Sequence, residues 1–215
     1  MMSLSQGNEI RYIQDSHAWE VWMSAQPKPL LSPEQYLQLE RQSDVRHEFH
    51  GGELFAMSGG TLNHSAIALN LGAELRLKLR DLPCRVFSSD LRIKIEATGL
   101  YTYPDLSVVC GVPLLEGDRK DTLLNPRVIV EVLSPSTEAY DRGKKFENYR
   151  TIPSLQEYLL VATDAPAIER FTRQSDGSWN LTVAKGPLAR MPVASLQCEL
   201  ELAEVYAKVG LEAGG

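Results

Sequence analysis

Arg127-Val-Ile-Val-Glu-Val-Leu-Ser134 is the stretch that decides the fold, because it is apolar at odd and even positions alike. A run rich in Val and Ile, bounded by Pro126 and Pro135, predicts a strand buried on both faces. Burying its one carboxylate, Glu131, is costly unless a partner compensates. Two interpretations of Glu131 follow: an ion pair with a core arginine or lysine, or a metal ligand.

The composition predicts one domain with a sizeable core. The 215 residues are 43% hydrophobic, and a net charge of −6 gives no general attraction to nucleic acid. Cys84, Cys110 and Cys198 are far apart, which fits a reducing compartment and argues against a thiolate zinc site. No apolar run is long enough to span a bilayer, and the first residues lack a secretory signal. We therefore expect a cytoplasmic protein without a membrane partner.

Working outward toward the N-terminus, the sequence predicts a short helix and a hairpin. Ser32 can cap a helix over residues 32–41, and Gln35 can complete its capping box. The stretch 46–57 predicts a hairpin that turns at Gly51-Gly52. Before these elements, residues 12–23 form a short helix or an arm in this interpretation.

A long helix and several strands account for the rest of the core. Apolar residues four apart predict a helix over residues 63–80, capped by Asn63. The alternation in Arg85–Glu96 predicts one half-exposed strand. Further strands are expected at Tyr103–Cys110, Glu157–Ala162, Ala167–Arg173 and Trp179–Val183, and a last strand and helix over residues 196–209 would close the sheet.

The decisive strand is followed by a predicted helix over residues 139–151. Asp141, Lys145 and Tyr149 are four apart and share one of its faces. The element order indicates an α+β fold in which helices cover one mixed β-sheet, with a hairpin extension. We divide the chain into an N-terminal arm (1–31), the main domain (32–205) and a C-terminal tail (206–215).

Asp105 and Glu131 are the candidate site residues, since they stand on consecutive strands and can converge if those strands pair. Two such carboxylates repel each other unless a cation or a proton lies between them. Magnesium suits this pair, because it takes one or two carboxylates and keeps waters for a phosphate. A nearby lysine would hold or deprotonate an attacking water, and burial next to a metal would favour that role by lowering the pKa of the lysine.

Several neighbouring polar residues have ordinary structural explanations. Glu48 fits an exposed strand residue, and His64 fits a packed, hydrogen-bonded residue in a first helical turn. Asp90 would form a surface ion pair with the cations on its face of the strand. The pair Asp141–Lys145 fits a solvated helix surface.

Longer motifs carry a resemblance to a known family. Tyr103-Pro104-Asp105, the run Ile129–Thr137 and the run Asp141–Tyr149 together resemble the Uma-type family of restriction-endonuclease-like proteins, within the PD-(D/E)XK nuclease superfamily. The resemblance extends over residues 32–204, and four shorter motifs also match: Arg46-His47-Glu48, Gly52-Glu53-Leu54, Asn63-His64 and Ser89-Asp90-Leu91. It implies a restriction-endonuclease-like mixed sheet.

One position departs from the superfamily pattern. Leu133 stands two residues after Glu131, where the superfamily motif has its lysine. In the resembling family the lysine lies on the following helix, and Lys145 is our candidate because it shares a face with Asp141 and Tyr149. If Lys145 were only a surface residue, the site would bind a metal without cleaving.

The resemblance implies an endonuclease that hydrolyses DNA with Mg²⁺ or Mn²⁺. Asp105, Glu131 and the backbone carbonyl of Val132 would bind the ion, and Lys145 would orient or activate the attacking water. Such nucleases often act as homodimers. The alternatives are a catalytically inactive nuclease fold that serves as a binding or scaffold protein, and RNA or a nucleotide as substrate. Asp90 and Glu48 would serve as outer ligands or bind a second cation. The supporting residues would be His64, Asp141 and Tyr149, and the phosphate contacts Arg92, Lys94, Arg142 and Lys144.

Overall fold

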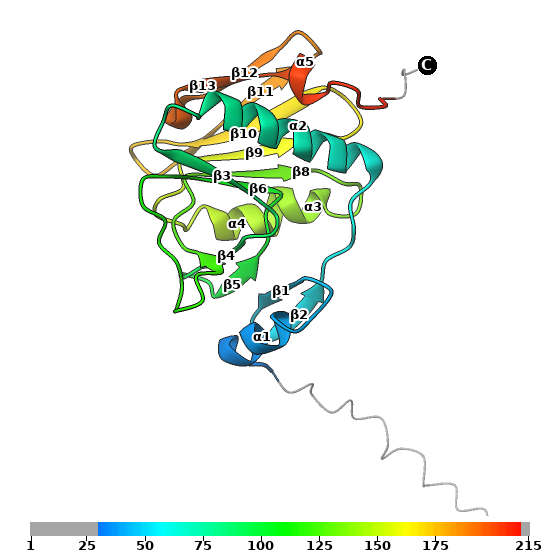
Figure 1. Ribbon diagram of the computed structural model, residues 1–215. Helices are drawn as coiled ribbons and strands as arrows, with labels where there is room; N and C mark the ends of the chain where they lie inside the picture. Colours follow the sequence, from blue (N-terminus) through cyan, green and yellow to red (C-terminus); the bar gives the residue numbers. More distant parts are fainter. Residues whose placement is uncertain (1–29, 212–215) are drawn as a thin grey trace, which may run out of the picture. The chain divides into compact units, whose positions relative to one another are not determined.

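The computed structural model describes residues 30–211, whose strands form three sheets. The expected arm over residues 12–23 lies outside the described residues, as do residues 1–29 and 212–215. The six-stranded sheet, in the order β11-β10-β9-β8-β6-β3, contains β3 (Cys84–Ser88), β6 (Leu106–Cys110), β8 (Val128–Val132), β9 (Glu157–Val161), β10 (Ala167–Arg173) and β11 (Trp179–Lys185) (Figure 1).

Strand β8 lies inside this sheet, as the sequence predicts. Every residue of β8 is buried, and the strand pairs in parallel with β9 and antiparallel with β6. In the β6–β8 register Leu106 lies opposite Val130. Asp105, which precedes β6, therefore comes next to Glu131, and the condition set by the sequence for the two carboxylates to converge is met.

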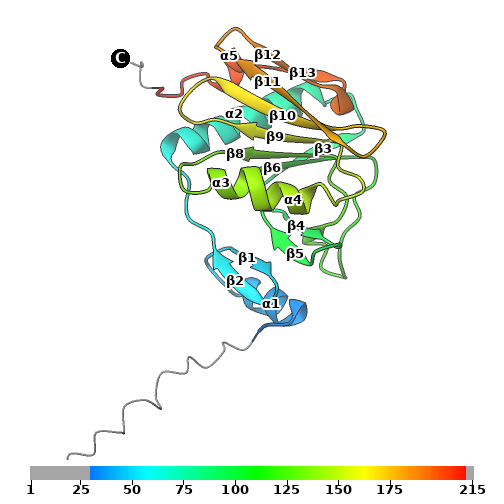
Figure 2. The ribbon, with the colours of Figure 1, turned by 180° about the vertical axis from the view of Figure 1, so that it is seen from behind.

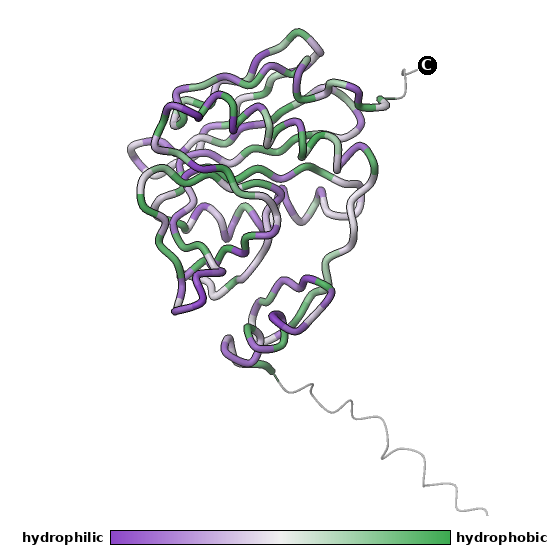
Figure 3. Tube along the Cα trace, in the orientation of Figure 1, coloured by the Kyte–Doolittle hydropathy of each residue, from purple (hydrophilic) through white to green (hydrophobic). Residues whose placement is uncertain are grey.

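The two faces of the sheet carry different cores. On one face Val130 packs with α2 (Leu62–Lys78), whose buried stripe includes Ile67 and Leu71 (Figure 1). On the other face Ile129 and Leu133 pack with α4 (Phe146–Tyr149), which follows α3 (Glu138–Tyr140) (Figure 2). The strands at the centre are mostly green, hence hydrophobic, in Figure 3. Because side chains alternate along a strand, Glu131 belongs to the α4 face.

A second sheet, in the order β2-β1-β5-β4-β7, carries the predicted hairpin. The hairpin and the capping box of α1 (Pro33–Glu40) are confirmed, with Gln35 Oε1 accepting from Ser32 N–H at 2.8 Å. Tyr36 of α1 stacks on Phe49 with ring centroids 4.8 Å apart. The strands of this sheet are β1 (His47–His50), β2 (Glu53–Ala56), β4 (Arg92–Ile95), β5 (Leu100–Thr102) and β7 (Thr122–Leu123).

The prediction of one half-exposed strand over Arg85–Glu96 is wrong. The chain turns at residues 89–91, where Leu91 N–H donates to Ser88 O at 3.1 Å, and this turn separates β3 from β4. The two strands belong to different sheets, and β4 is buried on both faces. The alternation of polar and apolar residues continues across the turn, which hid the break.

Two further predictions need correction. Thr61, and not Asn63, caps α2, since Thr61 Oγ1 accepts from His64 N–H at 3.2 Å while the Asn63 amide donates to Gly210 O. The last strand does not close the main sheet, because β13 (Cys198–Glu201) pairs with β12 (Arg190–Val193) in a separate ribbon that precedes α5 (Leu202–Val205). Tyr206, which falls in the expected tail, is buried against this core.

The cysteines also differ from expectation. Cys84 and Cys110 lie opposite each other on β3 and β6 and form a disulfide, whereas Cys198 is a free thiol. The wide spacing of the cysteines, which fits a reducing compartment, does not reveal this pair, because the strand pairing joins residues 26 positions apart. Within residues 30–211 no helix is long and apolar enough to cross a membrane. The cytoplasmic location stays a prediction.

Candidate active site

The backbone and side chains of Asp105 and Glu131 hold each other in place. Asp105 Oδ2 accepts from Val132 N–H at 2.7 Å, and Glu131 Oε2 accepts from Asp105 N–H at 3.4 Å. These contacts follow from the pairing of β6 with β8, which brings the end of one strand beside the middle of the other. The structure therefore gathers the two carboxylates that the sequence singled out.

Lys145 reaches this pair from the helix that follows β8. Its Nζ lies 3.0 Å from Glu131 Oε1, 3.2 Å from Asp141 Oδ1 and 3.5 Å from Glu48 Oε1. Tyr149 OH donates to the same Glu131 Oε1 at 2.6 Å. The shared face predicted for these helical residues is thus present. The prediction of a solvated surface for Asp141 and Lys145 is wrong, because both are buried.

A π-helical segment, Asp141–Lys145, joins α3 to α4. Such segments insert one residue into an otherwise α-helical run and are frequent at functional sites. Here Asp141 and Lys145 stand at the two ends of the segment and still contact each other. The segment places the Lys145 ammonium beside Glu131. Lys145 therefore supplies the positive charge that Leu133, in the usual lysine position, cannot supply.

His64 contacts the carboxylate pair from α2. Its Nε2 lies 3.2 Å from Asp105 Oδ2, and its side chain is only 18% exposed. This hydrogen bond to Asp105 raises the pKa of His64, with the charges of Glu131 and Asp141 adding to the effect. The helix N-terminus thus supplies a group that fixes Asp105, as the sequence suggested.

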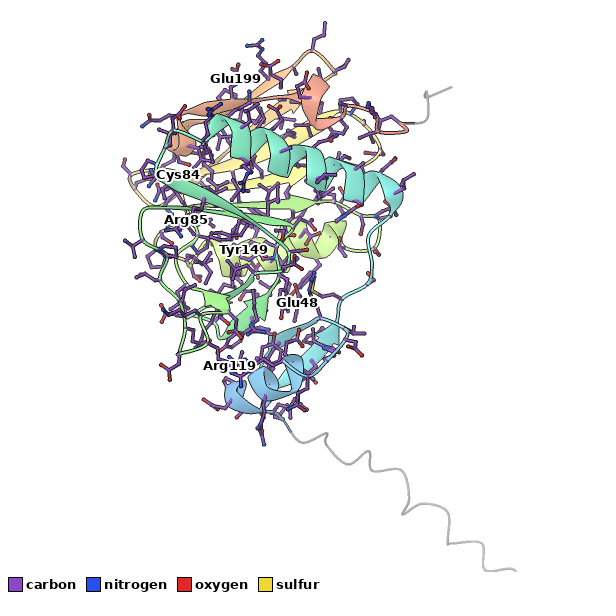
Figure 4. The ribbon with its side chains drawn as sticks, in the orientation of Figure 1. Glu48, Cys84, Arg85, Arg119, Tyr149 and Glu199 are labelled. Carbon is purple, nitrogen blue, oxygen red and sulfur yellow. A yellow bond between two sulfur atoms is a disulfide. The ribbon has the colours of Figure 1, made fainter. Side chains whose placement is uncertain are left out.

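Glu48 enters from the hairpin and is not the exposed residue that its polar strand predicts. Its side chain is buried, and its two oxygens accept from Thr102 Oγ1 and from Tyr140 OH. Figure 4 shows Glu48 and Tyr149 approaching the site from β1 and α4. Sequence reasoning missed Tyr140, although it stands one residue before Asp141 on a helix already singled out.

Negative charge exceeds positive charge in this cluster. Four carboxylates, Asp105, Glu131, Asp141 and Glu48, face one ammonium, Lys145, and one imidazole, His64, which is charged only when protonated. Burial raises the pKa of Glu131 to about 8, and the charges of Asp105 and Asp141 add to the rise while Lys145 opposes it. The surplus charge favours either a proton or a cation at the site.

The same surroundings change what Lys145 can do. Burial alone would lower its pKa, but Glu131, Glu48 and Asp141 together raise the pKa well above its usual value. The expected lowering of this pKa, by burial next to a metal, is thus opposed by three neighbouring carboxylates. Lys145 keeps its proton, and it can orient a water or contact a phosphate as a cation.

The donor set fits a divalent ion with few protein ligands. Asp141 Oδ1 is buried and lies 3.2 Å from Lys145 Nζ without forming a well-directed hydrogen bond, and the available ligand atoms are hard carboxylate oxygens. Among the described residues, no three His, Cys, Asp or Glu side chains form a ready-made metal cluster. A magnesium ion held by one or two carboxylates and several waters needs no such cluster.

Asp90, predicted as a further metal ligand, lies elsewhere. It sits in the turn between β3 and β4 with its side chain 76% exposed, and it pairs with Arg46 and Ser88. The predicted alternation placed it on a strand beside Arg92 and Lys94, and the turn removes it from that face. The structure gives Asp90 no place among the gathered carboxylates.

Three of the four predicted phosphate contacts are already neutralised. Arg92 is buried, with Nη1 donating to Tyr103 OH at 2.8 Å and Nη2 lying 3.3 Å from Asp121 Oδ1. Lys94 pairs with Glu116, and Arg142 pairs with Glu138 and Glu169. Lys144 alone of the four is exposed and, within residues 30–211, has no carboxylate partner.

A groove of about 1130 Å³ opens beside the carboxylates. His64 and Asp105 line it together with residues of the 57–60 loop, of α2 and of β3. Arg76 of α2 is exposed on its wall and, among the described residues, pairs with no carboxylate. The groove gives an extended ligand access to Asp105, which of the four carboxylates is the one that lines it.

Comparison with known proteins identifies the family of this chain. The family model Uma2, described as "Putative restriction endonuclease", matches residues 33–204. The chain belongs to the Uma2 family. The resemblance drawn from the sequence is therefore confirmed, and it covers most of the chain.

Two relatives of this Uma2 chain come from Synechocystis sp. and are both named as uncharacterized proteins. One, slr1290, is 45% identical over 155 residues, which are 71% of this chain and 80% of the relative. The other, sll1609, is 36% identical over 162 residues, or 75% of this chain and 92% of the relative. A solved structure from Anabaena variabilis, titled a putative nuclease belonging to DUF820, has a TM-score of 0.65 at 20% identity and covers 80% of this chain and 96% of its own. That match confirms the fold.

Proposed function

We propose that this Uma2 protein is a divalent-cation-dependent endonuclease that hydrolyses phosphodiester bonds in DNA. The observation that carries the proposal is the convergence of Asp105 and Glu131, with a buried lysine beside them and more negative than positive charge. Family membership supports a nuclease in general. The metal and the DNA substrate rest on the chemistry of the cluster.

Asp105 and Glu131 would hold the ion, and a bound Mg²⁺ or Mn²⁺ supplies charge compensation at the phosphate and acidifies a water. The chain's own residues do the positioning. His64 and the Val132 amide fix Asp105, while Tyr149 fixes Glu131. Lys145, which stays protonated, orients the nucleophilic water and offsets charge on the phosphate.

The groove beside Asp105 supports DNA as the ligand, since an extended phosphodiester can lie along it with its scissile bond at the carboxylates. Arg76 on the groove wall replaces the paired cations Arg92, Lys94 and Arg142 as a phosphate contact in this proposal. Cutting both strands of a duplex needs two active sites, so we expect a homodimer. Light scattering that shows only the 24.0 kDa monomer would contradict the expected homodimer.

A plasmid-nicking assay tests the proposal. The wild type should nick supercoiled DNA with Mg²⁺ or Mn²⁺ and stop when EDTA is added, and Asp105→Asn should not nick. Glu147→Gln is the control for loss of a carboxylate, because Glu147 is exposed on α4, the helix that carries Tyr149, and should be dispensable for cleavage. Parallel reactions with RNA and with nucleotides identify the substrate class.

The inactive-scaffold alternative has a distinct outcome. Equal nicking by the wild type and Asp105→Asn would contradict the proposed site. Absence of cleavage on every substrate, combined with a Mn²⁺-dependent rise in melting temperature that Glu131→Gln removes, would leave a metal-binding protein without nuclease activity.

A further inference from the structure

In the loop between β2 and α2, Gly60 lies against the ring of His64. A Cβ atom added to Gly60 would lie 2.6 Å from Nδ1, 3.0 Å from Cγ and 3.3 Å from Cε1 of His64. Real Cβ contacts are essentially never shorter than 3.0 Å. The close approach therefore requires a residue without a side chain at position 60.

The opposite edge of the same ring contacts the acidic pair. Nε2 of His64 lies 3.2 Å from Asp105 Oδ2, so the imidazole is held between the backbone of Gly60 and a carboxylate of the site. The imidazole is rigid and planar. A displacement of its Nδ1 edge therefore moves Nε2 as well.

The main chain of His64 offers little freedom to absorb such a displacement. His64 lies in the first turn of α2, where its N–H donates to the capping hydroxyl of Thr61 at 3.2 Å. The helix beyond it is anchored by the buried side chains Ile67 and Leu71. While the 57–60 loop keeps its place, the ring responds by rotation about its side-chain torsions, which separates Nε2 from Asp105.

We propose that Gly60 is a positioning residue of this site: its missing side chain lets the 57–60 loop hold the His64 imidazole on Asp105. The effect on the ring follows from the geometry alone. The effect on cleavage rests on the proposed nuclease function. Loss of the His64 contact leaves Asp105 Oδ2 with the Val132 amide as its remaining donor, so the carboxylate is less firmly placed.

The test compares Gly60→Ala with Gly59→Ala. Both substitutions add one methyl group to neighbouring residues of the same loop, but nothing lies within 4 Å of a Cβ at Gly59. NMR spectra of the His64 ring at fixed pH report its contact with residue 60 and its hydrogen-bonded N–H. Gly60→Ala should shift or broaden the His64 ring signals, and Gly59→Ala should leave them in place.

Cleavage provides the second measurement. Gly60→Ala should lower kcat/KM by roughly tenfold to 100-fold, the range for a misplaced catalytic group. In a His64→Ala background the same substitution should change nothing, because the added methyl no longer meets the ring. This non-additivity distinguishes positioning through His64 from a general disturbance of the loop.

The outcomes separate the two proposals. Unchanged His64 signals in Gly60→Ala overturn the positioning role, whatever the nuclease assay gives. Shifted signals in a protein that cleaves no substrate support the positioning role and contradict the proposed function. If Gly60→Ala folds poorly, Gly60→Ala/His64→Ala decides, since relief of the clash should restore the melting temperature of His64→Ala. Failure of that restoration counts against the contact with His64.

Discussion

Two buried charged clusters in this protein differ in how completely their groups are paired. Around Arg92 the guanidinium bonds Tyr103 OH and Thr122 Oγ1 and stacks on Tyr36, with its carbon 5.5 Å from the ring centre. Around Lys145, three carboxylates share one ammonium, and the buried Oδ1 of Asp141 lies 3.2 Å from that ammonium without forming a well-directed hydrogen bond.

The Arg92 cluster extends to Glu40, which accepts from Tyr103 OH and His47 N–H, both at 2.9 Å. Its donors and acceptors match, so it joins α1 to the second sheet as a structural element. The Lys145 cluster has surplus acceptors, which is costly for stability and useful for binding a cation. We infer that the balance of buried charge, rather than its presence, separates a structural cluster from a functional one here.

The largest effect expected is the loss of cleavage in Glu131→Gln. Removing a ligand oxygen at the reacting centre should lower kcat by about 1000-fold. Because burial and neighbouring carboxylates raise the pKa of Glu131, its neutral form is favoured, and the melting temperature should stay level or rise. A fall in melting temperature measured by calorimetry at pH 7 would show that Glu131 is a structural residue like Arg92.

Arg92→Met should lower stability and leave cleavage unchanged, which is the reverse of the result expected for Glu131→Gln. It leaves buried hydroxyls of Tyr103 and Thr122 without their partner, at a cost of about 3 kcal/mol in the free energy of unfolding. Activity per folded molecule should be retained. Arg142→Met is the matched control, because its ion pairs are partly exposed and should be worth about 1 kcal/mol or less. Equal losses in the free energy of unfolding of the two variants, measured by urea titration, would contradict a special structural role for Arg92.

Glu40→Gln and Glu131→Gln should change the free energy of unfolding differently, although the substitution is the same. The amide keeps one acceptor oxygen where the carboxylate uses two, so the free energy of unfolding should fall by about 1–2 kcal/mol. The same substitution at Glu131 loses only the long contact from Asp105 N–H, at 3.4 Å, and removes one of several crowded buried carboxylates, so it should not lower stability. Thermal melts of the two variants in one buffer make the test, and effects of equal sign at both positions would contradict the idea of a balanced and an unbalanced cluster.

The smallest effect is expected at the groove. Arg76→Ala should weaken DNA binding a few-fold and reduce the salt dependence of log K by about one unit, as for one lost phosphate contact. Lys94→Ala is the control, because Lys94 is already paired with Glu116. Fluorescence anisotropy at several salt concentrations measures both. A larger loss of DNA affinity in Lys94→Ala than in Arg76→Ala would contradict binding of DNA in the groove.

The features predicted correctly from the sequence depend on short-range regularities. A run of Val and Ile predicts β8, and pairing of consecutive strands predicts that Asp105 meets Glu131. Helical spacing places Lys145 with Tyr149 on one face. Each prediction needs only the local period of the chain and one pairing between neighbours.

The features that were missed depend on long-range pairing. The period of two in Arg85–Glu96 persists through the turn, so nothing in it reveals that β3 and β4 enter different sheets. Burial of Arg92 requires Tyr103 and Thr122 to be brought around it by that second sheet. The disulfide likewise requires the β3–β6 register, which spacing alone does not give.

The π-helical segment Asp141–Lys145 also limits which insertions and deletions this chain can tolerate. Each residue of an α-helix advances the side chain by about 100° around the axis. Deleting one residue here would restore a regular helix while rotating everything that follows, so Tyr149 would turn away from the strand. We therefore expect length changes to be tolerated in the surface loops of this protein and rejected within these five residues.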